Sequence, residues 1–502
     1  MRNNRLRKIA ILLALLFVCA LLPLQGDAED SYAENLSAKC KYGGSISVHK
    51  DRLIDEDFES AQRVAKGKYL SIEWSDAVPA RSVMLSFYYD PVAYTVTQYD
   101  AKGTTLLESE GTLLWNNLFE LETDARKIVI RADENDFAIC SLYVYGEGTV
   151  LDYHPFEQTP EKADYMLIAM HPDDDVLFLG AIIPTYGVQQ GYEGIAVYLG
   201  TRLRVRRQEA LNGAWVMGLR TLPVFGGFPD IPPEYYNKFK STFTKDDVIR
   251  YVVTILRKYR PEVVVSQDLN GEYGHWQHKL LAEGILEAVP LANDGTYQPK
   301  GYPKYEPWQV KKLYLHLYPE NKIKLNARVP IDGLDGKTAF EVATEAFQCH
   351  KSQLPSRHSV QDKGIYSLTD FGLAYTAVGN DTPGVNDMFE HIDPSLLSAV
   401  KTPEATETPT DAPVPDLTPE LTEEPMVTND LTNTPETTPE PTAEPTDAAV
   451  ETQTPAASAT IDSPEKQEGG EHADRIILFA GAGLVLLLVV LFVALLLVRK
   501  RR

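Results

Sequence analysis

The stretch that decides the fold is residues 166–180, Met-Leu-Ile-Ala-Met-His-Pro-Asp-Asp-Asp-Val-Leu-Phe-Leu-Gly. Its apolar start predicts a buried strand, and apolar residues return at helical spacing after the aspartates. Proline suits the first helical position and one aspartate is enough to cap a helix, so a simple turn explains part of the pattern. Three aspartates beside His171 exceed what a cap requires, which makes this turn a candidate site for chemistry.

From about residue 165 onward, strand and helix patterns alternate. We expect strands at residues 165–170, 194–199, 222–226, 262–267 and 311–317, and helices at 176–190, 202–219, 246–258, 275–288 and 339–350. Strands that alternate with helices predict an α/β fold, a Rossmann-like parallel sheet with helices on both faces. In such sheets ligands bind beyond the carboxyl ends of the strands.

A second predicted strand is also followed by an unusual cluster of polar residues. The strand expected at 262–267 leads to His275-Trp-Gln-His278 at the start of a helix. Two histidines three residues apart lie close to one helix face, and parallel strands bring both clusters to the same sheet edge. Two histidines and a carboxylate form a three-ligand set, which with an open fourth position is the catalytic form of a zinc site.

Each part has a simpler explanation when taken alone. A lone histidine is more often a satisfied polar residue, H-x-x-H on a helix is weakly specific, and aspartates after a strand are usually caps. The joint occurrence at matching topological positions favours a metal site. Three further histidines are left as structural or supporting residues: His154, His316 and His350.

Five motifs, in order over nearly two hundred residues, resemble those of the PIG-L/LmbE-like N-acetylglucosaminyl deacetylase family. The first motif of that family, A-H-P-D-D-E, corresponds to residues 170–175, and its G-H-P-D-H corresponds to residues 274–278. The other matches are Arg206, Glu209 and Gly218 for R-x-x-E with a later glycine, Phe228-Pro-Asp230 for an aromatic-Pro-Asp stretch, and His350-Lys-Ser-Gln353 for H-x-S-Q.

The resemblance implies a zinc ion, or another divalent transition metal, as cofactor. Its ligands would be His171, Asp174 and His278. Adjacent aspartates suit this chemistry because one binds the ion while its neighbour, Asp173, accepts a proton from water as general base.

The resemblance also implies roles for residues around the metal. His275 would stabilise or protonate the transition state, and Tyr273 would polarise the substrate carbonyl. Arg206 and Asp230 would hold sugar hydroxyls. Trp276-Gln277 replaces Pro-Asp of the family, so we expect weaker support of a histidine there. Trp276 is a candidate face for a sugar ring, with helix packing as the alternative.

Residues 29–150 show short strands and turns without a long helical pattern, as at residues 69–74, 83–89 and 127–131. This pattern predicts an all-β sandwich or jelly roll. It resembles a discoidin-like, galactose-binding-type domain, which implies a module that binds carbohydrate or a surface, with a purely structural domain as the alternative. Cys40 and Cys140 flank the region, and we hypothesise a disulfide between them.

The ends of the chain predict a protein held at a cell membrane. Residues 1–28 have the order of a secretory signal peptide, and residues 402–474 form a Thr/Pro/Glu-rich stalk expected to be disordered. Residues 475–498 predict a transmembrane helix, and the basic tail 499–502 is expected in the cytoplasm. The stalk carries much of the net charge of −23, and the acidic balance argues against nucleic acid as a partner.

Together these patterns favour a cell-surface, single-pass enzyme with its deacetylase domain at residues 151–401. Its expected partner is an N-acetylated aminosugar glycan or glycoconjugate. Two other functions fit the sequence: an inactive carbohydrate-binding or adhesive protein, and a metal-dependent amidase acting on an aminosugar conjugate. Asp173 favours an enzyme, because a protein that only binds sugar needs no general base.

Overall fold

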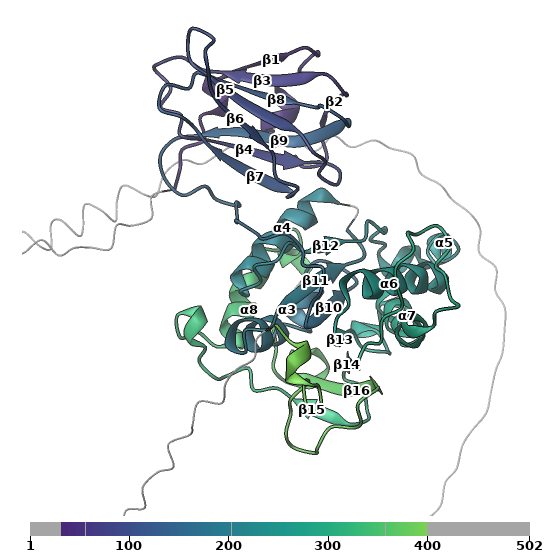
Figure 1. Ribbon diagram of the computed structural model, residues 1–502. Helices are drawn as coiled ribbons and strands as arrows, with labels where there is room; N and C mark the ends of the chain where they lie inside the picture. The colour runs from purple at the N-terminus through teal and green to yellow at the C-terminus, as the bar shows by residue number, and fades with distance from the viewer. Residues whose placement is uncertain (1–31, 56, 202, 357, 399–502) are drawn as a thin grey trace, which may run out of the picture. The chain divides into compact units, whose positions relative to one another are not determined.

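The computed structural model of the chain describes residues 32–398, apart from 56, 202 and 357 (Figure 1). The expected signal peptide, stalk, membrane helix and basic tail lie outside these residues. Within the described part of the chain, no helix combines the length and apolar character needed to cross a membrane. The described residues all belong to one compact unit.

A seven-stranded sheet organises the part of the chain from residue 165 onward. Its order is β12 (Val224–Phe225), β11 (Gly194–Tyr198), β10 (Tyr165–Ala169), β13 (Val263–Ser266), β14 (Lys312–His316), β16 (Asp370–Thr376) and β15 (Lys322–Lys324). The first five strands are parallel, and β16 and β15 are antiparallel to their neighbours. All five expected strands are present, and the α/β architecture is confirmed.

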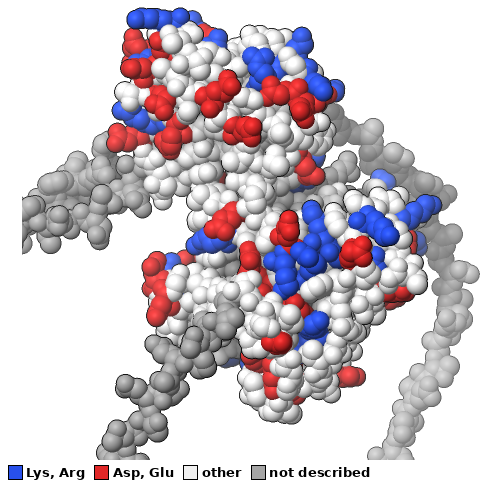
Figure 2. Space-filling view, in the orientation of Figure 1, with Lys and Arg blue, Asp and Glu red and all other residues white. Residues whose placement is uncertain are grey.

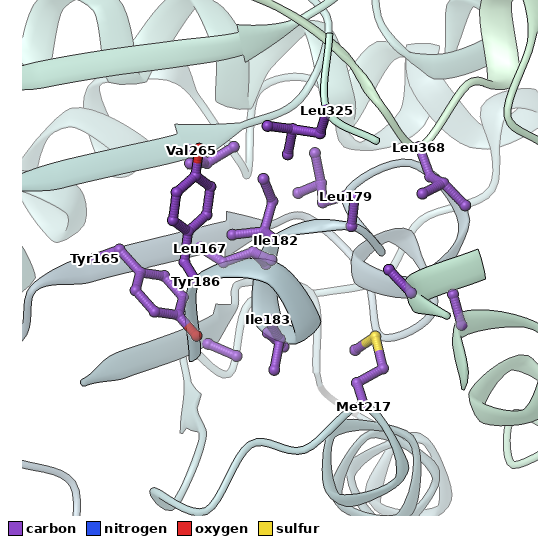
Figure 3. Packing of buried hydrophobic residues seen from close by; sticks show 14 of the residues in the cluster. Tyr165, Leu167, Leu179, Ile182, Ile183, Tyr186, Met217, Val265, Leu325 and Leu368 are labelled. Carbon is purple, nitrogen blue, oxygen red and sulfur yellow. The ribbon is translucent and has the colours of Figure 1, made fainter. Parts of the chain in front are cut away.

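Helices cover both faces of this sheet because the strands are apolar on both sides. Alternate residues of β10 point to opposite faces: Leu167 packs with one set of helices and Ile168 with the other. Figure 3 shows the buried cluster that contains Leu167. Its helices are α3 (Asp174–Leu177), α4 (Arg204–Val216) and α8 (Ala339–Phe347), and those of the other face are α6 (Lys245–Tyr259) and α7 (Trp276–Asn293).

The prediction of one continuous helix at residues 176–190 is wrong. The α-helix α3 ends at Leu177, and a π-helix, η2 (Ile183–Gln189), follows after a turn. Gly180 lies in this turn, where a Cβ atom would stand 2.9 Å from the Cβ of Ala343 in α8. The absence of a side chain at Gly180 therefore leaves room for the close approach of α8. Strands β15 and β16 were also absent from the sequence prediction.

The N-terminal region forms two antiparallel sheets. One has the order β1 (Lys41–Gly44), β3 (Tyr69–Glu73), β8 (Lys127–Arg131), β5 (Thr95–Tyr99), β6 (Thr105–Glu110), and the other β2 (Gln62–Val64), β9 (Phe137–Tyr145), β4 (Ser82–Phe87), β7 (Asn116–Glu120). Ile72 and Ile130 of the first sheet share one buried cluster with Leu85 and Leu142 of the second. The two sheets thus enclose a common apolar core (Figure 1).

Helix α4 connects this core to the parallel sheet. Leu211 of α4 belongs to the apolar cluster of the N-terminal sheets. Asn116 donates a hydrogen bond from Nδ2 to Oε1 of Gln208 at 2.7 Å, and the guanidinium of Arg207 lies 4.3 Å from the ring centre of Trp115. One side of α4 is therefore packed against the N-terminal sheets.

The expected disulfide between Cys40 and Cys140 is wrong, because both residues are free thiols. Cys140 is the extra residue of a β-bulge, since Ser86 pairs with Ser141 and Phe87 with Ile139. Its Sγ lies 3.5 Å from the carbonyl oxygen of Phe87, whereas Sγ of Cys40 lies 3.5 Å from that of Leu36. Flanking one region in sequence does not place two thiols side by side.

Candidate metal centre

The two unusual loops meet at the topological switch point of the sheet. The chain runs from β10 to β11 and β12 on one side, and then returns to β13 on the other side of β10. In open α/β sheets this reversal opens a crevice at the carboxyl ends of the two central strands. His171 follows β10 there, and His275 and His278 stand at the start of α7, which follows β13.

Three side-chain atoms converge at this point. Nδ1 of His171 lies 2.9 Å from Nε2 of His278, and the Oδ2 atom of Asp174 lies 3.4 Å from the first and 3.3 Å from the second. Tetrahedral ligands about 2.1 Å from a zinc ion stand roughly 3.4 Å apart. The spacing and the donor types fit a divalent transition metal, and all three side chains are buried.

A second combination, His171, His275 and His278, also offers three nitrogen atoms within 4.8 Å of one another. The set with Asp174 is tighter and includes a negative charge that offsets the charge of a cation. His275 uses Nδ1 to accept a hydrogen bond from the backbone N–H of Gln277 at 3.2 Å. Asp174 is therefore the better candidate for the third ligand, with His275 beside the set.

Gln277 determines which nitrogen of His171 faces the three-atom set. Its Oε1 lies 3.2 Å from Nε2 of His171 and accepts from the backbone N–H of Ile231, while its Nε2 donates to the carbonyl of Pro229. Nε2 of His171 therefore carries the proton, and Nδ1 keeps a free lone pair. The sequence suggested that glutamine weakens this support, but its carbonyl oxygen occupies the acceptor position.

Asp174 is held ionised by its neighbours. Burial opposes ionisation, but the imidazoles of His278 and His171 outweigh it and hold the pKa of this carboxyl well below its usual value. The backbone N–H of His171 also donates to Oδ2 of Asp174 at 2.7 Å. The ligand carboxylate is thus fixed before any cation binds.

Asp173 stands beside the ligands in a strained conformation. Its φ of 113° is rare for a residue with a side chain and costs about 1–3 kcal/mol. Burial raises the pKa of Asp173, and the guanidinium of Arg206 opposes that rise. Nη2 of Arg206 donates to Oδ1 of Asp173 at 2.6 Å. A strained, buried carboxyl beside a metal set has the features of a functional residue.

Arg206 joins Asp173 to Asp230. Its guanidinium donates to Oδ2 of Asp230 and to the carbonyl of Pro172 as well as to Asp173. Oδ1 of Asp230 lies 3.4 Å from Nε2 of His171. Both Nη atoms of Arg206 are therefore engaged within the protein, and contact of Arg206 and Asp230 with sugar hydroxyls stays a prediction.

Tyr273 and His275 lie next to the three-atom set. The ring centre of Tyr273 is 5.4 Å from that of His278 and 5.9 Å from that of His275. Burial, together with the charges of Asp174 and Asp173, raises the pKa of the Tyr273 hydroxyl, so this group remains a donor. Burial lowers the pKa of His275 to about 3, and its neutral ring presents an N–H at Nε2 because Nδ1 accepts from the backbone.

Trp276 makes the contacts of a packing residue. Its ring centre lies 6.4 Å from that of Phe243 in the cluster on the α6 and α7 face, and 5.2 Å from that of Tyr236. This matches the helix-packing alternative, and a role of Trp276 in sugar binding stays a prediction.

Two motifs that lie far apart in sequence meet beside the site. Glu209 of α4 accepts hydrogen bonds from the backbone N–H and the hydroxyl of Ser352 at 2.7 and 2.6 Å. This contact links R-x-x-E to H-x-S-Q and fixes the helix that carries Arg206. His350 is fully buried near Gly213 and makes no side-chain hydrogen bond to another described residue.

Several supporting contacts were not predicted from the sequence, although His316 was expected to be a structural or supporting residue. The hydroxyl of Tyr198 donates to Asp175 at 2.6 Å, and Oε1 of Gln267 accepts from the backbone N–H of Met170 at 2.8 Å. Nδ1 of His316 lies 2.9 Å from both carboxylate oxygens of Glu272, directly before Tyr273. The sequence held one signal for these contacts: an acidic residue, Glu272, stands directly before Tyr273 in the segment that follows a buried strand.

The part of the chain that carries the three-atom set is similar to known proteins. The family described as PIG-L, GlcNAc-PI de-N-acetylase, matches residues 166–289, which include the whole three-atom set. A 1D-myo-inositol 2-acetamido-2-deoxy-alpha-D-glucopyranoside deacetylase of Saccharopolyspora erythraea is 31% identical over 207 residues, covering 36% of this chain and 73% of that protein. The chain belongs to the PIG-L family.

Other similarities are more distant. A deacetylase of the same description from Catenulispora acidiphila is 25% identical, and the match covers 31% of this chain and 56% of that protein, just over half its length. The solved structure of N,N'-diacetylchitobiose deacetylase from Pyrococcus horikoshii matches with a TM-score of 0.30 and 20% identity, covering 38% of this chain and 71% of that one.

Proposed function

We propose that this PIG-L protein is a metal-dependent N-deacetylase that removes acetyl groups from an N-acetylglucosamine-type sugar, glycan or glycoconjugate. The observation that carries the proposal is the convergence of His171, Asp174 and His278 at the sheet's switch point with Asp173 beside them. The deacetylase descriptions of its relatives support the same reaction.

The three converging side chains would hold zinc or another divalent transition metal. Bound there, the cation would supply Lewis acidity toward the acetamido carbonyl and the attacking water. Asp173 would accept a proton from that water, with Arg206 orienting its carboxylate. When the C–N bond breaks, the leaving amine takes up a proton, and the same carboxyl would return it.

Two donors are suited to the oxyanion that forms during attack. The hydroxyl of Tyr273 and the Nε2–H of His275 both belong to rings beside the ligand set. Such preorganised donors contribute about 2.7–4 kcal/mol each to stabilising a transition state. Since Nδ1 of His275 accepts from the backbone, this residue acts as a hydrogen-bond donor rather than as the source of the amine's proton.

The N-terminal sheets would form a discoidin-like module, residues 29–150, that binds carbohydrate and keeps the deacetylase domain, residues 151–401, near a polymeric substrate. Secretion through residues 1–28 and anchoring through residues 475–498 would place both domains at the cell surface. On the face in Figure 2, described Lys and Arg side chains lie among Asp and Glu, so this face offers no uniformly basic surface to a polyanion.

Acetate release by the purified full-length protein tests the function. The substrates would be N-acetylglucosamine, N,N'-diacetylchitobiose and an N-acetylglucosaminyl-inositol, each with and without a chelator. We expect release that the chelator abolishes and zinc restores. Sugar binding without release would favour the inactive carbohydrate-binding protein. Cleavage of an aminosugar conjugate with a larger N-acyl group, without acetate release from the three acetylated substrates, would favour the amidase.

A further inference from the structure

A buried pair of side chains, His316 and Glu272, fixes the loop that carries Tyr273. His316 is the last residue of β14, and Glu272 begins η4 (Glu272–Gly274), a short 3-10 helix between β13 and α7. Both side chains are fully or almost fully buried. Nδ1 of His316 lies 2.9 Å from each carboxylate oxygen of Glu272. A neighbouring strand therefore holds this loop from outside the segment itself.

The other contacts of the pair extend this anchor to two more segments. Nε2 of His316 lies 2.6 Å from the carbonyl oxygen of Ser367, shortly before β16, and must donate because a carbonyl oxygen only accepts. Burial lowers the pKa of His316, but the Glu272 carboxylate outweighs it and raises this pKa, so Nδ1 also carries a proton. Oε1 of Glu272 accepts from the backbone N–H of Asp268 at 2.9 Å. The pair thus joins the end of β14 to the segments after β13 and before β16.

The loop beside this pair has an uncommon backbone. The φ angle is positive at Gly271, Tyr273 and Gly274, with values of 75°, 44° and 79°. Glycine adopts such angles freely, whereas a residue with a side chain rarely does. Such conformations persist only where surrounding contacts hold them. Glu272 stands between Gly271 and Tyr273, so its hydrogen bonds to His316 are contacts of this kind.

The ring of Tyr273 depends on this backbone for its position. Tyr273 is 44% exposed, so packing covers little more than half of it. Its ring centre lies 5.4 Å from that of His278 and 5.9 Å from that of His275. The ring centre of Phe178 is 6.2 Å from that of Tyr273 and 5.9 Å from that of His316, which adds a second link between them. A rotation of the backbone at Tyr273 would displace the hydroxyl relative to the metal-ligand set.

We propose that His316 and Glu272 are positioning residues for deacetylation, which hold Tyr273 in its left-handed conformation and so keep its hydroxyl beside the metal-ligand set. The inference rests on the proposed function, in which Tyr273 donates to the oxyanion. It gives β14, a strand without any of the five family motifs, a part in the site. Neither residue belongs to the metal-ligand set, so loss of the pair should lower turnover through Tyr273 and leave the metal in place.

Two variants of the full-length, zinc-loaded protein remove the anchor. Glu272→Ala deletes the carboxylate, and the double variant His316→Phe/Glu272→Leu replaces the pair by apolar groups, which leaves no buried charge unpaired. With the fastest of the three acetylated substrates, we expect kcat to fall about 10- to 100-fold in both, since a misplacement of about 1 Å can cost 100-fold. Zinc content and KM should change by less than about 2-fold.

A double-variant cycle shows whether the effect passes through Tyr273. Tyr273→Phe alone should lower kcat about 100- to 1,000-fold, the loss for one oxyanion donor. If Glu272 acts by placing that hydroxyl, Glu272→Ala should lower kcat by less than about 2-fold further in the Tyr273→Phe protein. Glu272→Gln keeps an acceptor for Asp268 and His316 and should retain most of the turnover.

Asp381→Asn is the control for lost stability alone. Asp381 pairs with the buried Lys312 at the amino end of the same strand, β14. This variant should therefore unfold at a lower temperature while its kcat stays unchanged.

Hydrogen exchange tests the anchor without turnover. The backbone N–H groups of Gly274 and His275 donate to the carbonyl oxygens of Gly271 and Glu272 at 2.9 Å within the loop. We expect peptides that span residues 268–278 to exchange faster in Glu272→Ala than in the unsubstituted protein. Unchanged exchange, unchanged kcat, or equal losses of kcat with and without the tyrosine hydroxyl would overturn the inference. Absence of acetate release by the unsubstituted protein would contradict the proposed function instead, and the exchange result would then decide the anchor alone.

Discussion

The Oε1 atom of Gln277 lies 3.2 Å from Nε2 of His171, so a residue that is not a ligand selects the nitrogen that faces the metal set. Groups that orient ligand histidines typically contribute 10- to 100-fold to metal affinity. We predict that Gln277→Leu lowers zinc affinity by about this factor, measured by competition with a chromogenic chelator. Gln277→Glu keeps an acceptor at this position and serves as control; unchanged affinity in Gln277→Leu would contradict the assignment.

Asp173→Asn separates metal binding from catalysis. Asparagine keeps the size of the side chain and tolerates positive φ, so the fold and the zinc content should be retained. Loss of the proton acceptor should lower kcat about 10²- to 10⁴-fold. Zinc content by plasma mass spectrometry and acetate release are measured on the same sample, and near-normal turnover in the variant would refute the general-base role.

Cys40 and Cys140 are expected to react as thiols only after unfolding. Burial raises the pKa of Cys40 to about 11 and that of Cys140 to about 12, which leaves little thiolate at neutral pH. We predict that alkylation in denaturant without reductant modifies both residues, as detected by peptide mass spectrometry. A peptide pair joined through these two sulfurs would show that the bridge exists.

The buried pair of His316 and Glu272 predicts a pH-dependent stability. Burial lowers the pKa of His316, but the Glu272 carboxylate outweighs it and raises the pKa above the usual value near 6.5. The stabilisation is complete below about pH 6.5 and is lost as pH rises through the folded-state pKa. The difference in unfolding free energy between the parent protein and His316→Gln should therefore shrink with rising pH; a difference that grows instead would contradict the charged pair.

Local patterns were enough to predict the parallel sheet and its two candidate loops. The apolar strands at 165–170 and 262–267 differ from their surroundings in period, and parallel strands place both carboxyl ends at one edge. The convergence of His171, Asp174 and His278 follows from that topology. The strands and the two loops could be predicted because they depend on short segments and on strand direction, which the sequence encodes directly.

Other features depend on contacts that no local pattern reveals. The close approach of Ala343 to Gly180 joins residues more than 160 positions apart. The antiparallel pairing of β16 and the position of Cys140 in a bulge are set by distant strands. Gln277 was read as a lost carboxylate, because its role requires knowing that its carbonyl oxygen faces His171.

A crystal structure of the zinc-loaded protein, with anomalous data collected on both sides of the zinc absorption edge, tests the central claim most directly. We expect one zinc ion about 2.0–2.2 Å from Nδ1 of His171, Oδ2 of Asp174 and Nε2 of His278. Zinc coordinated by His171, His275 and His278 without Asp174, or no zinc at this point under saturating metal, would contradict it.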